Sequence, residues 1–305
     1  FDSGEKESLK AFHTAGFLGS EFSPFFLVEP DQAVDAVKPP DGMSDTRFAK
    51  RYKEYKKLLA SSPIQQHGSE HQKESLLKSI DNAHRLLSSP KARKAFDLSL
   101  ESKESYDTYK VGGRFGLGCL LAKRLTEAGA RFIEVTHGYY PFKYWDTHDN
   151  GHTKMKDLKK MIDAPIAQLV LDLEKSKLLD RTLIVVASEF SRDMMMEGKP
   201  EKRVKDQVQV PARIDGPQHY GMHRHFTGAG SVLLFGGGIK KGFVYGETAD
   251  ERPCTTIKDP INTQQLHATM YRALGIPHDH HYNVEQRPFY VTPDGVTEPV
   301  MDLFG

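Results

Sequence analysis

Three stretches of the sequence carry carboxylate and imidazole side chains close together, where they could bind a cation. The first contains Asp146 and His148 and follows an apolar run at residues 131–136. In an extended segment, residues two positions apart point to the same face, so these two side chains could share one ion. The alternative interpretation is a strand followed by a polar turn, in which Asp146 caps the next helix.

The second stretch contains Glu189 and Arg192, directly after the apolar run at residues 182–187. Glu189 could be a metal ligand, and the planar guanidinium of Arg192 could bind an anionic oxygen. The alternative is an ion pair between these two side chains at the end of a strand.

The third stretch, residues 216–225, holds three imidazoles within seven residues, at His219, His223 and His225. Such density is difficult to explain as core packing, but spacing alone leaves open which of them bind metal. The roles of His152 and Asp193 are open as well. Oxygen and imidazole ligands without thiolate suit zinc or manganese, and calcium or magnesium suits a site dominated by carboxylates.

The elements that must position these stretches alternate between helix and strand. Apolar runs predict strands at residues 131–136, 182–187, 231–235 and 243–246, and helical spacing predicts helices at 112–128, 153–177 and 259–274. The 182–187 run is typical of a central strand buried on both faces. This order favours a parallel α/β sheet, in which ligands bind beyond the carboxyl ends of the strands.

Two details qualify the predicted helices. Pro165 should interrupt the helix at 153–177. The glycine-rich start at Gly112 could cradle a phosphate, but it lacks the Lys-Ser/Thr end of a P-loop, so it favours a helix start with close packing.

The first third of the chain carries almost no strand signal. Residues 1–42 predict irregular chain, and amphipathic helices are expected at 44–60 and 70–87, with a third that begins at Ser89 and Pro90. We interpret residues 44–110, with helices near 44–100, as a helical insertion in one domain that spans residues 1–305. The charged residues 194–218 predict a long, flap-like loop.

Composition argues against several classes of partner. Lys and Arg number 42 and Asp and Glu 41, so no global charge favours nucleic acid, and the basic face of the 44–60 helix is best explained as solvated. No run approaches the roughly 18 apolar residues of a membrane span. The two cysteines, Cys119 and Cys254, indicate buried or incidental thiols more than a disulfide scaffold. The chain begins at Phe1, and we expect it to be processed or truncated.

Several stretches in a fixed order resemble a known family. They are residues 114–135, 145–150 (WDTHDN), 178–192, 218–220 (QHY) and 232–250, followed by the helix at 259–275. Together they resemble the bacterial domain-of-unknown-function family 1501, which in turn is similar to the alkaline phosphatase and sulfatase superfamily. The likeness covers roughly residues 112–275.

This resemblance implies an alkaline phosphatase-like, three-layer α/β/α sandwich with a largely parallel central sheet and a cation site at the strand ends. It places Asp146, His148, Glu189 and His219 among the metal ligands and gives Arg192 an assisting role. Family members commonly carry an export signal, which implies a periplasmic or extracellular location.

The sequence also departs from the family. Gln218 stands where the family has an aspartate, Ser191 replaces a glycine, and Asp193 replaces a small hydroxyl residue. The superfamily takes its first metal aspartate and its nucleophile from a segment that would precede Phe1. We therefore name no nucleophile.

The expected function is metal-dependent hydrolysis of a phosphate or sulfate ester, on a small-molecule or glycan substrate and with a divalent ion as cofactor. The alternative is a catalytically inactive, sulfatase-like protein that binds a structural metal or an anionic glycan. Gln218 and the missing upstream segment both favour this alternative.

Overall fold

The computed structural model describes residues 14–138, 144–147, 150–188, 190–192, 213, 215–216, 218, 225–251, 254–284 and 286–305. The chain divides into two compact units. The first comprises Phe1–Val135 with Asn283–Arg287, and the second comprises Thr136–Tyr282 with Pro288–Gly305. The prediction of one domain over residues 1–305 stays a prediction.

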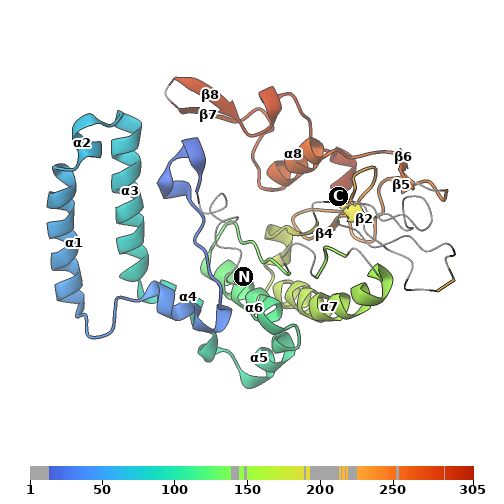
Figure 1. The fold of residues 1–305 in the computed structure, drawn as a ribbon, viewed down its shortest axis with the longest axis horizontal. Helices are drawn as coiled ribbons and strands as arrows, with labels where there is room; N and C mark the ends of the chain where they lie inside the picture. The colour runs from blue at the N-terminus through green and yellow to red at the C-terminus, as the bar shows by residue number, and fades with distance from the viewer. Residues whose placement is uncertain are drawn as a thin grey trace. The chain divides into compact units, whose positions relative to one another are not determined.

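The first unit is helical. Its helices are α1 (Asp45–Ala60), α2 (Pro63–His67), α3 (Glu70–Leu87), α4 (Pro90–Phe96), α5 (Lys103–Lys110) and α6 (Gly113–Ala128). Figure 1 shows α1 and α3 side by side, joined through α2. The first five helices each begin after a serine whose hydroxyl accepts a backbone N–H of the first turn. These elements confirm the predicted helices at 44–60 and 70–87 and the third, which begins at Pro90.

The described chain before α1, residues 14–44, is irregular, as predicted, and contains the 3-10 turns η3 (Gly16–Leu18), η4 (Ser20–Phe22) and η5 (Pro30–Val37). Val37 is fully buried, as are Tyr109 and Leu120. Element η5 contacts α4, α6 and η6 (Leu98–Leu100). The core of this unit therefore lies among η5, α4, α5 and α6.

Helix α6 confirms both its predicted end and its close packing. It ends at Gly129, whose φ of 96° is left-handed. A Cβ at Gly118 would lie 2.8 Å from Val135 Cγ1, so any larger residue there would force Val135 to shift.

A charged cluster lies inside the first unit. Arg124 Nη1 donates to Glu101 Oε1 at 2.5 Å, and Lys123 Nζ lies 3.3 Å from Glu101 Oε2. Arg124 also donates to the Ala95 carbonyl oxygen at 3.1 Å. The cluster joins α6 to α4 and to the chain before α5.

The second unit contains most of the strands. In chain order its elements are α7 (Gly151–Lys175), η7 (Leu179–Arg181), β1 (Ile184–Val186), β2 (Ser191–Arg192), β3 (His225–Phe226), β4 (Leu233–Phe235), β5 (Glu247–Thr248), β6 (Thr256–Lys258), α8 (Thr263–Ala273), η9 (Pro293–Gly295) and η10 (Met301–Leu303). Strands β7 (His281–Val284) and β8 (Arg287–Tyr290) pair with each other. Buried side chains include Leu158, Leu169, Leu173, Ala268 and Leu303.

The combination of helices and strands confirms a mixed α and β fold. Strand β1 pairs antiparallel with β4, with Val185 opposite Leu234; β2 pairs antiparallel with β3, and β5 with β6. Each sheet within the described chain has two strands. Gly236 and Gly237 both have positive φ and bring the chain back to Leu179. The Gly237 N–H donates to the Leu179 carbonyl oxygen at 3.1 Å.

Some predicted elements were wrong. Residues 132–138 and 243–246 hold no strand, although both runs are apolar. Strand β1 is half-buried, not buried on both faces, and Leu233 opposite it is 55% exposed. An apolar run specifies neither a ladder partner nor burial by itself, since Phe132 is 77% exposed and Val244 is 86% exposed.

The predicted helices of the second unit also need correction. Helix α7 continues through Pro165, whose side chain is fully buried. Helix α8 begins after Asn262, which forms a capping box with Gln265, and not at Asp259. Asp259 has a φ of 44° and precedes a proline, which disfavours helix. No described helix is long and apolar enough to cross a membrane. Of the flap-like loop at 194–218, residues 213, 215, 216 and 218 are described; the rest lies outside the described residues.

Candidate functional site

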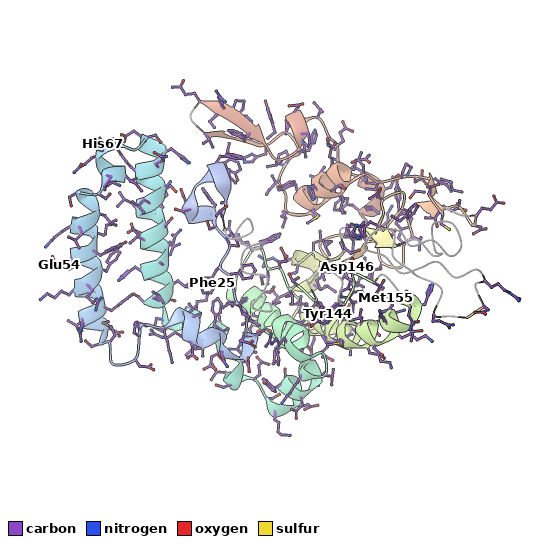
Figure 2. All side chains as sticks on the ribbon, in the orientation of Figure 1. Phe25, Glu54, His67, Tyr144, Asp146 and Met155 are labelled. Carbon is purple, nitrogen blue, oxygen red and sulfur yellow. The ribbon has the colours of Figure 1, made fainter. Side chains whose placement is uncertain are left out.

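The structure describes part of the predicted site. Asp146 is described and half-buried, and the backbone of Arg192 lies in β2. His148, Glu189 and His219 lie outside the described residues, as do His223 and Asp193. Figure 2 labels Asp146 together with Tyr144, close to it in the chain.

Asp146 lies close to the imidazole of His225, a residue whose role the sequence left open. Asp146 Oδ1 lies 3.5 Å from His225 Nε2. The Asp146 side chain is 23% exposed and that of His225 is 53% exposed. The structure thus joins the first and third polar stretches through this pair.

The pairing of β2 with β3 positions His225. In this register His225 stands opposite Arg192, and its ring stacks on Phe190 with centroids 4.1 Å apart. The Ser191 hydroxyl contacts the carbonyl oxygens of Phe226 at 3.1 Å and of Ala229 at 2.5 Å. Ser191 therefore has a structural role, because its hydroxyl holds β2 against β3 and the segment that follows.

The loop before Asp146 is held by Trp145. Its indole N–H donates to His137 Nδ1 at 2.7 Å, so the proton of a neutral His137 resides on Nε2. Burial lowers the pKa of His137, which favours this neutral form. The Thr147 N–H donates to the Trp145 carbonyl at 2.8 Å, and Thr147 is buried. These bonds fix the backbone on both sides of Asp146.

Helix α7 begins next to this loop without a side-chain cap. Its N-cap residue is Asn150, in a left-handed conformation with φ of 50°. The interpretation of Asp146 as the cap is therefore wrong. Asn150 Oδ1 is buried and has no hydrogen-bond partner within the described part of the chain. A buried amide oxygen is a ligand that hard cations accept.

The separation of Asp146 and His225 suits two ligands of one ion. Direct N–H···O hydrogen bonds are usually about 2.7–3.2 Å long, so 3.5 Å is long for one. Zinc bonds of about 2.0–2.1 Å at tetrahedral angles separate neighbouring ligand atoms by roughly 3.3 Å. No group of three or more His, Cys, Asp or Glu side chains with ligand geometry occurs among the described residues. Further ligands would come from residues outside them.

Comparison with known families agrees with the resemblance to domain-of-unknown-function family 1501 and gives no match to the sulfatase superfamily. The family described as "Protein of unknown function (DUF1501)" matches residues 1–303. The chain belongs to this family. The DUF1501 match extends the likeness from residues 112–275 to almost the whole chain. Neither the curated proteins nor the solved structures give a match, so the chemistry of this DUF1501 chain must be argued from its site.

Sequence reasoning missed the contact of His225 with Asp146 and its stacking on Phe190. One signal was available, because His225 and Phe226 precede a Gly-rich turn and could pair with the residues after the 182–187 run. The sequence did not specify the register, and register decides which histidine faces Asp146.

Proposed function

We propose that this chain is a metal-dependent hydrolase of phosphate or sulfate esters, with Asp146 and His225 as two ligands of a divalent ion. The observation that carries the proposal is the 3.5 Å separation of Asp146 Oδ1 and His225 Nε2. The family resemblance adds His148, Glu189 and His219 as further ligands.

Each residue has a defined task in this proposal. Asp146 supplies negative charge, and its neighbours Trp145 and Thr147 keep its backbone in place through their hydrogen bonds. His225 is oriented by stacking on Phe190, which reduces the entropy lost when it binds an ion. Arg192, opposite His225 in the ladder, would bind an anionic ester oxygen. A bound divalent ion supplies Lewis-acid polarisation of that ester.

The proposal includes the finer fold that the resemblance implies. In an alkaline phosphatase-like sandwich, the order α6, α7 and β1 would deliver residues 188–192 to the end of a central strand. The mixed α and β architecture and the position of β2 directly after β1 support this interpretation. The proposed location, periplasmic or extracellular, rests on the resemblance alone.

One observation favours the alternative of an inactive, sulfatase-like protein that binds a structural ion or an anionic glycan. Gln218 occupies the position of a family aspartate, and its side-chain amide folds back against Gly216, where a Cβ would collide with it. A neutral amide supplies less ligand charge than a carboxylate. A measurement of ester hydrolysis therefore decides between a catalytic metal site and a structural one.

The deciding experiment compares wild type with Asp146→Ala and with the control His267→Ala, an exposed histidine on α8. Metal content is measured after incubation with zinc, manganese, calcium or magnesium, and hydrolysis is measured on aryl phosphate and aryl sulfate. We expect wild type and the control to bind metal and hydrolyse one ester, and Asp146→Ala to lose both. Metal binding without hydrolysis would support the inactive alternative. Absence of both would refute the metal site.

A further inference from the structure

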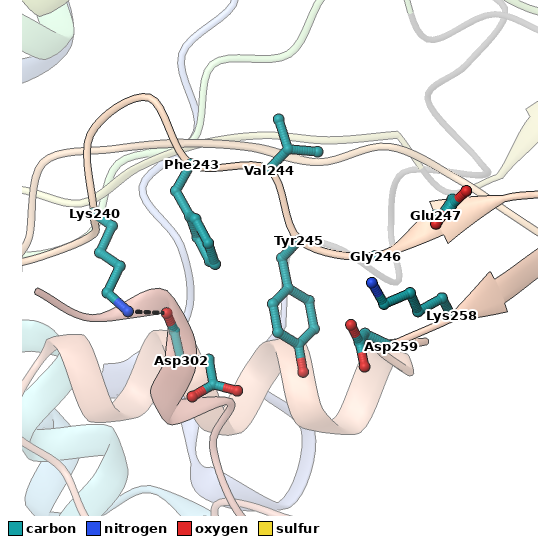
Figure 3. Close-up of a pocket in the computed structure, with 9 residues that line it drawn as sticks. All are labelled: Lys240, Phe243, Val244, Tyr245, Gly246, Glu247, Lys258, Asp259 and Asp302. Carbon is teal, nitrogen blue, oxygen red and sulfur yellow. Dashed lines mark hydrogen bonds between the residues drawn. The ribbon is translucent and has the colours of Figure 1, made fainter.

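A groove with a volume of about 410 Å³ lies in the second unit, formed by residues that the metal-site proposal does not use. Three segments that are distant in the sequence form it, and Figure 3 shows their side chains. They are residues 240–247, the end of β6 with Asp259, and Asp302 on η10. This volume lies within the range of about 300–1,000 Å³ that is usual for small-ligand sites.

Backbone and side-chain bonds fix one wall of the groove. The Lys240 N–H donates to the Leu303 carbonyl at 2.8 Å, and Ile239 forms an antiparallel bridge with Phe304. Lys240 Nζ donates to the Asp302 carbonyl oxygen at 2.8 Å and lies 5.1 Å from the centroid of the Phe243 ring. This lysine therefore joins η10 to the aromatic side of the groove.

The other wall depends on a glycine. Gly246 has a φ of 84°, and a Cβ there would lie 3.2 Å from the Asp259 carbonyl oxygen. This close approach brings Tyr245 opposite Lys258 and Asp259, as Figure 3 shows. The groove is thus a consequence of the backbone and not only of side-chain placement.

Two aromatic rings project into the groove, and Val244 between them points away (Figure 3). The centroids of Phe243 and Tyr245 are 6.3 Å apart, with the rings tilted by 54°. Phe243 is 46% exposed, so a large part of its ring surface is available to a ligand. Exposed aromatic faces favour stacking on the C–H groups of a flat ligand or contact with a cation.

The polar lining contains both hydrogen-bond donors and acceptors. Lys240 and Lys258 supply ammonium donors, and Glu247, Asp259 and Asp302 supply carboxylate acceptors. Because two cations face three anions, the lining is close to neutral and would neither attract a strong anion nor strongly prefer a cation. Desolvation, with the nearby charges of Asp259 and Asp302, raises the pKa of Tyr245, so its hydroxyl keeps its proton and can donate.

We propose that this groove binds a neutral saccharide, with Phe243 and Tyr245 stacking on sugar rings and the charged side chains binding hydroxyl groups. Sugar hydroxyls donate and accept at once, which matches a lining of ammonium, phenol and carboxylate groups. Their ring C–H faces match the exposed aromatic surface. A phosphate or sulfate ester matches less well, because the lining holds three carboxylates against two ammonium groups and so offers no excess of positive charge.

The test measures binding of neutral hexasaccharides of glucose, mannose and xylose by saturation-transfer NMR and titration calorimetry. We expect at least one to bind wild type, Phe243→Ala to weaken its Kd by about tenfold or more, and Tyr245→Phe to weaken it less. Val296→Ala is the matched control, because Val296 is exposed and does not line the groove, and this change should leave the Kd unchanged. Circular dichroism and the Tm show that each variant is folded.

Saccharide binding is also measured at different salt concentrations and in the presence of a metal chelator. Binding should be insensitive to ionic strength, because the ligand is uncharged. It should also survive a chelator, which separates this groove from the proposed metal site. The proposal is overturned if no neutral hexasaccharide binds, if Phe243→Ala binds as well as wild type, or if binding requires an anionic sugar and falls steeply with salt.

Discussion

Asp146 Oδ1 lies 3.5 Å from His225 Nε2, although α7, β1 and β2 separate the two residues in the chain. Neither residue is placed by its own neighbours alone. The hydrogen bond from Trp145 to His137 positions the loop that carries Asp146, and the β2–β3 ladder positions His225. An ion between them would therefore join the loop before α7 to that ladder.

Replacement of His225 by alanine should weaken zinc binding by at least about tenfold, because one imidazole ligand is lost. Competition with a chromophoric chelator measures the Kd. His267→Ala removes an exposed histidine of α8 and should leave the Kd unchanged. An unchanged Kd in His225→Ala would show that this imidazole is only a hydrogen-bond partner of Asp146.

Part of this site could be predicted from the sequence. The importance of Asp146 follows from its position between an apolar run and a helix, and the cluster of three histidines singles out residues 219–225. The choice of His225 could not be predicted, because it depends on which residue of β3 stands opposite Arg192. A shift of one residue would place His225 on the other face of the ladder.

Acidification should weaken the contact between Trp145 and His137. Burial holds the pKa of His137 below its usual 6.5, so the unfolded chain takes up this proton first as the pH falls. Folding stability should therefore decrease from pH 6.5 downward until the folded histidine is also protonated. Protonated Nδ1 cannot accept the indole N–H, and Trp145 is the sole tryptophan, so its fluorescence reports this step.

His137→Phe keeps a ring beside Trp145 but removes the titrating group. We expect its fluorescence to lack the acid transition of wild type, while His267→Ala retains it. An emission spectrum of wild type that stays constant through this pH range would contradict the assignment.

The core of the first unit should depend strongly on Leu120. This side chain is fully buried in α6, whereas Leu58 of α1 is 69% exposed. Leu120→Ala should lower the free energy of unfolding by about 2–5 kcal/mol, because it removes apolar contacts and leaves a cavity. Leu58→Ala makes the same change at an exposed helical position and should alter the free energy of unfolding by less than about 0.5 kcal/mol. Urea denaturation followed by circular dichroism measures both, and equal effects would contradict the position of the core.

The helices were easier to predict than the strands for a physical reason. Helix α3 begins at a serine cap and α6 ends at Gly129, and such signals are local in sequence. A strand needs a partner from elsewhere in the chain. Residues 131–136 therefore predicted a strand that the structure does not form, and the antiparallel pairing of β1 with β4 was not visible in either segment.

The cluster of Glu101, Lys123 and Arg124 should give the first unit an acid-sensitive stability. Burial alone would raise the pKa of Glu101, but hydrogen bonds from Arg124 and Ser105 and the charge of Lys123 lower it below 4.5. The stabilisation is therefore complete above the pKa of the unfolded chain and is lost as the pH falls through the folded value. Glu101→Gln removes the titrating charge, so its unfolding free energy should change less with pH than that of wild type.

The same variant should be less stable than wild type by about 3–5 kcal/mol at neutral pH, because Arg124, only 12% exposed, loses its carboxylate partner and keeps only carbonyl oxygens. Glu54→Gln is the matched control, since Glu54 pairs with Lys57 at 3.0 Å on the exposed side of α1. That change should cost less than about 1 kcal/mol, because solvent screens an exposed pair. Urea denaturation from neutral to acidic pH measures both variants. Parallel pH curves for wild type and Glu101→Gln would show that this carboxylate does not control acid stability.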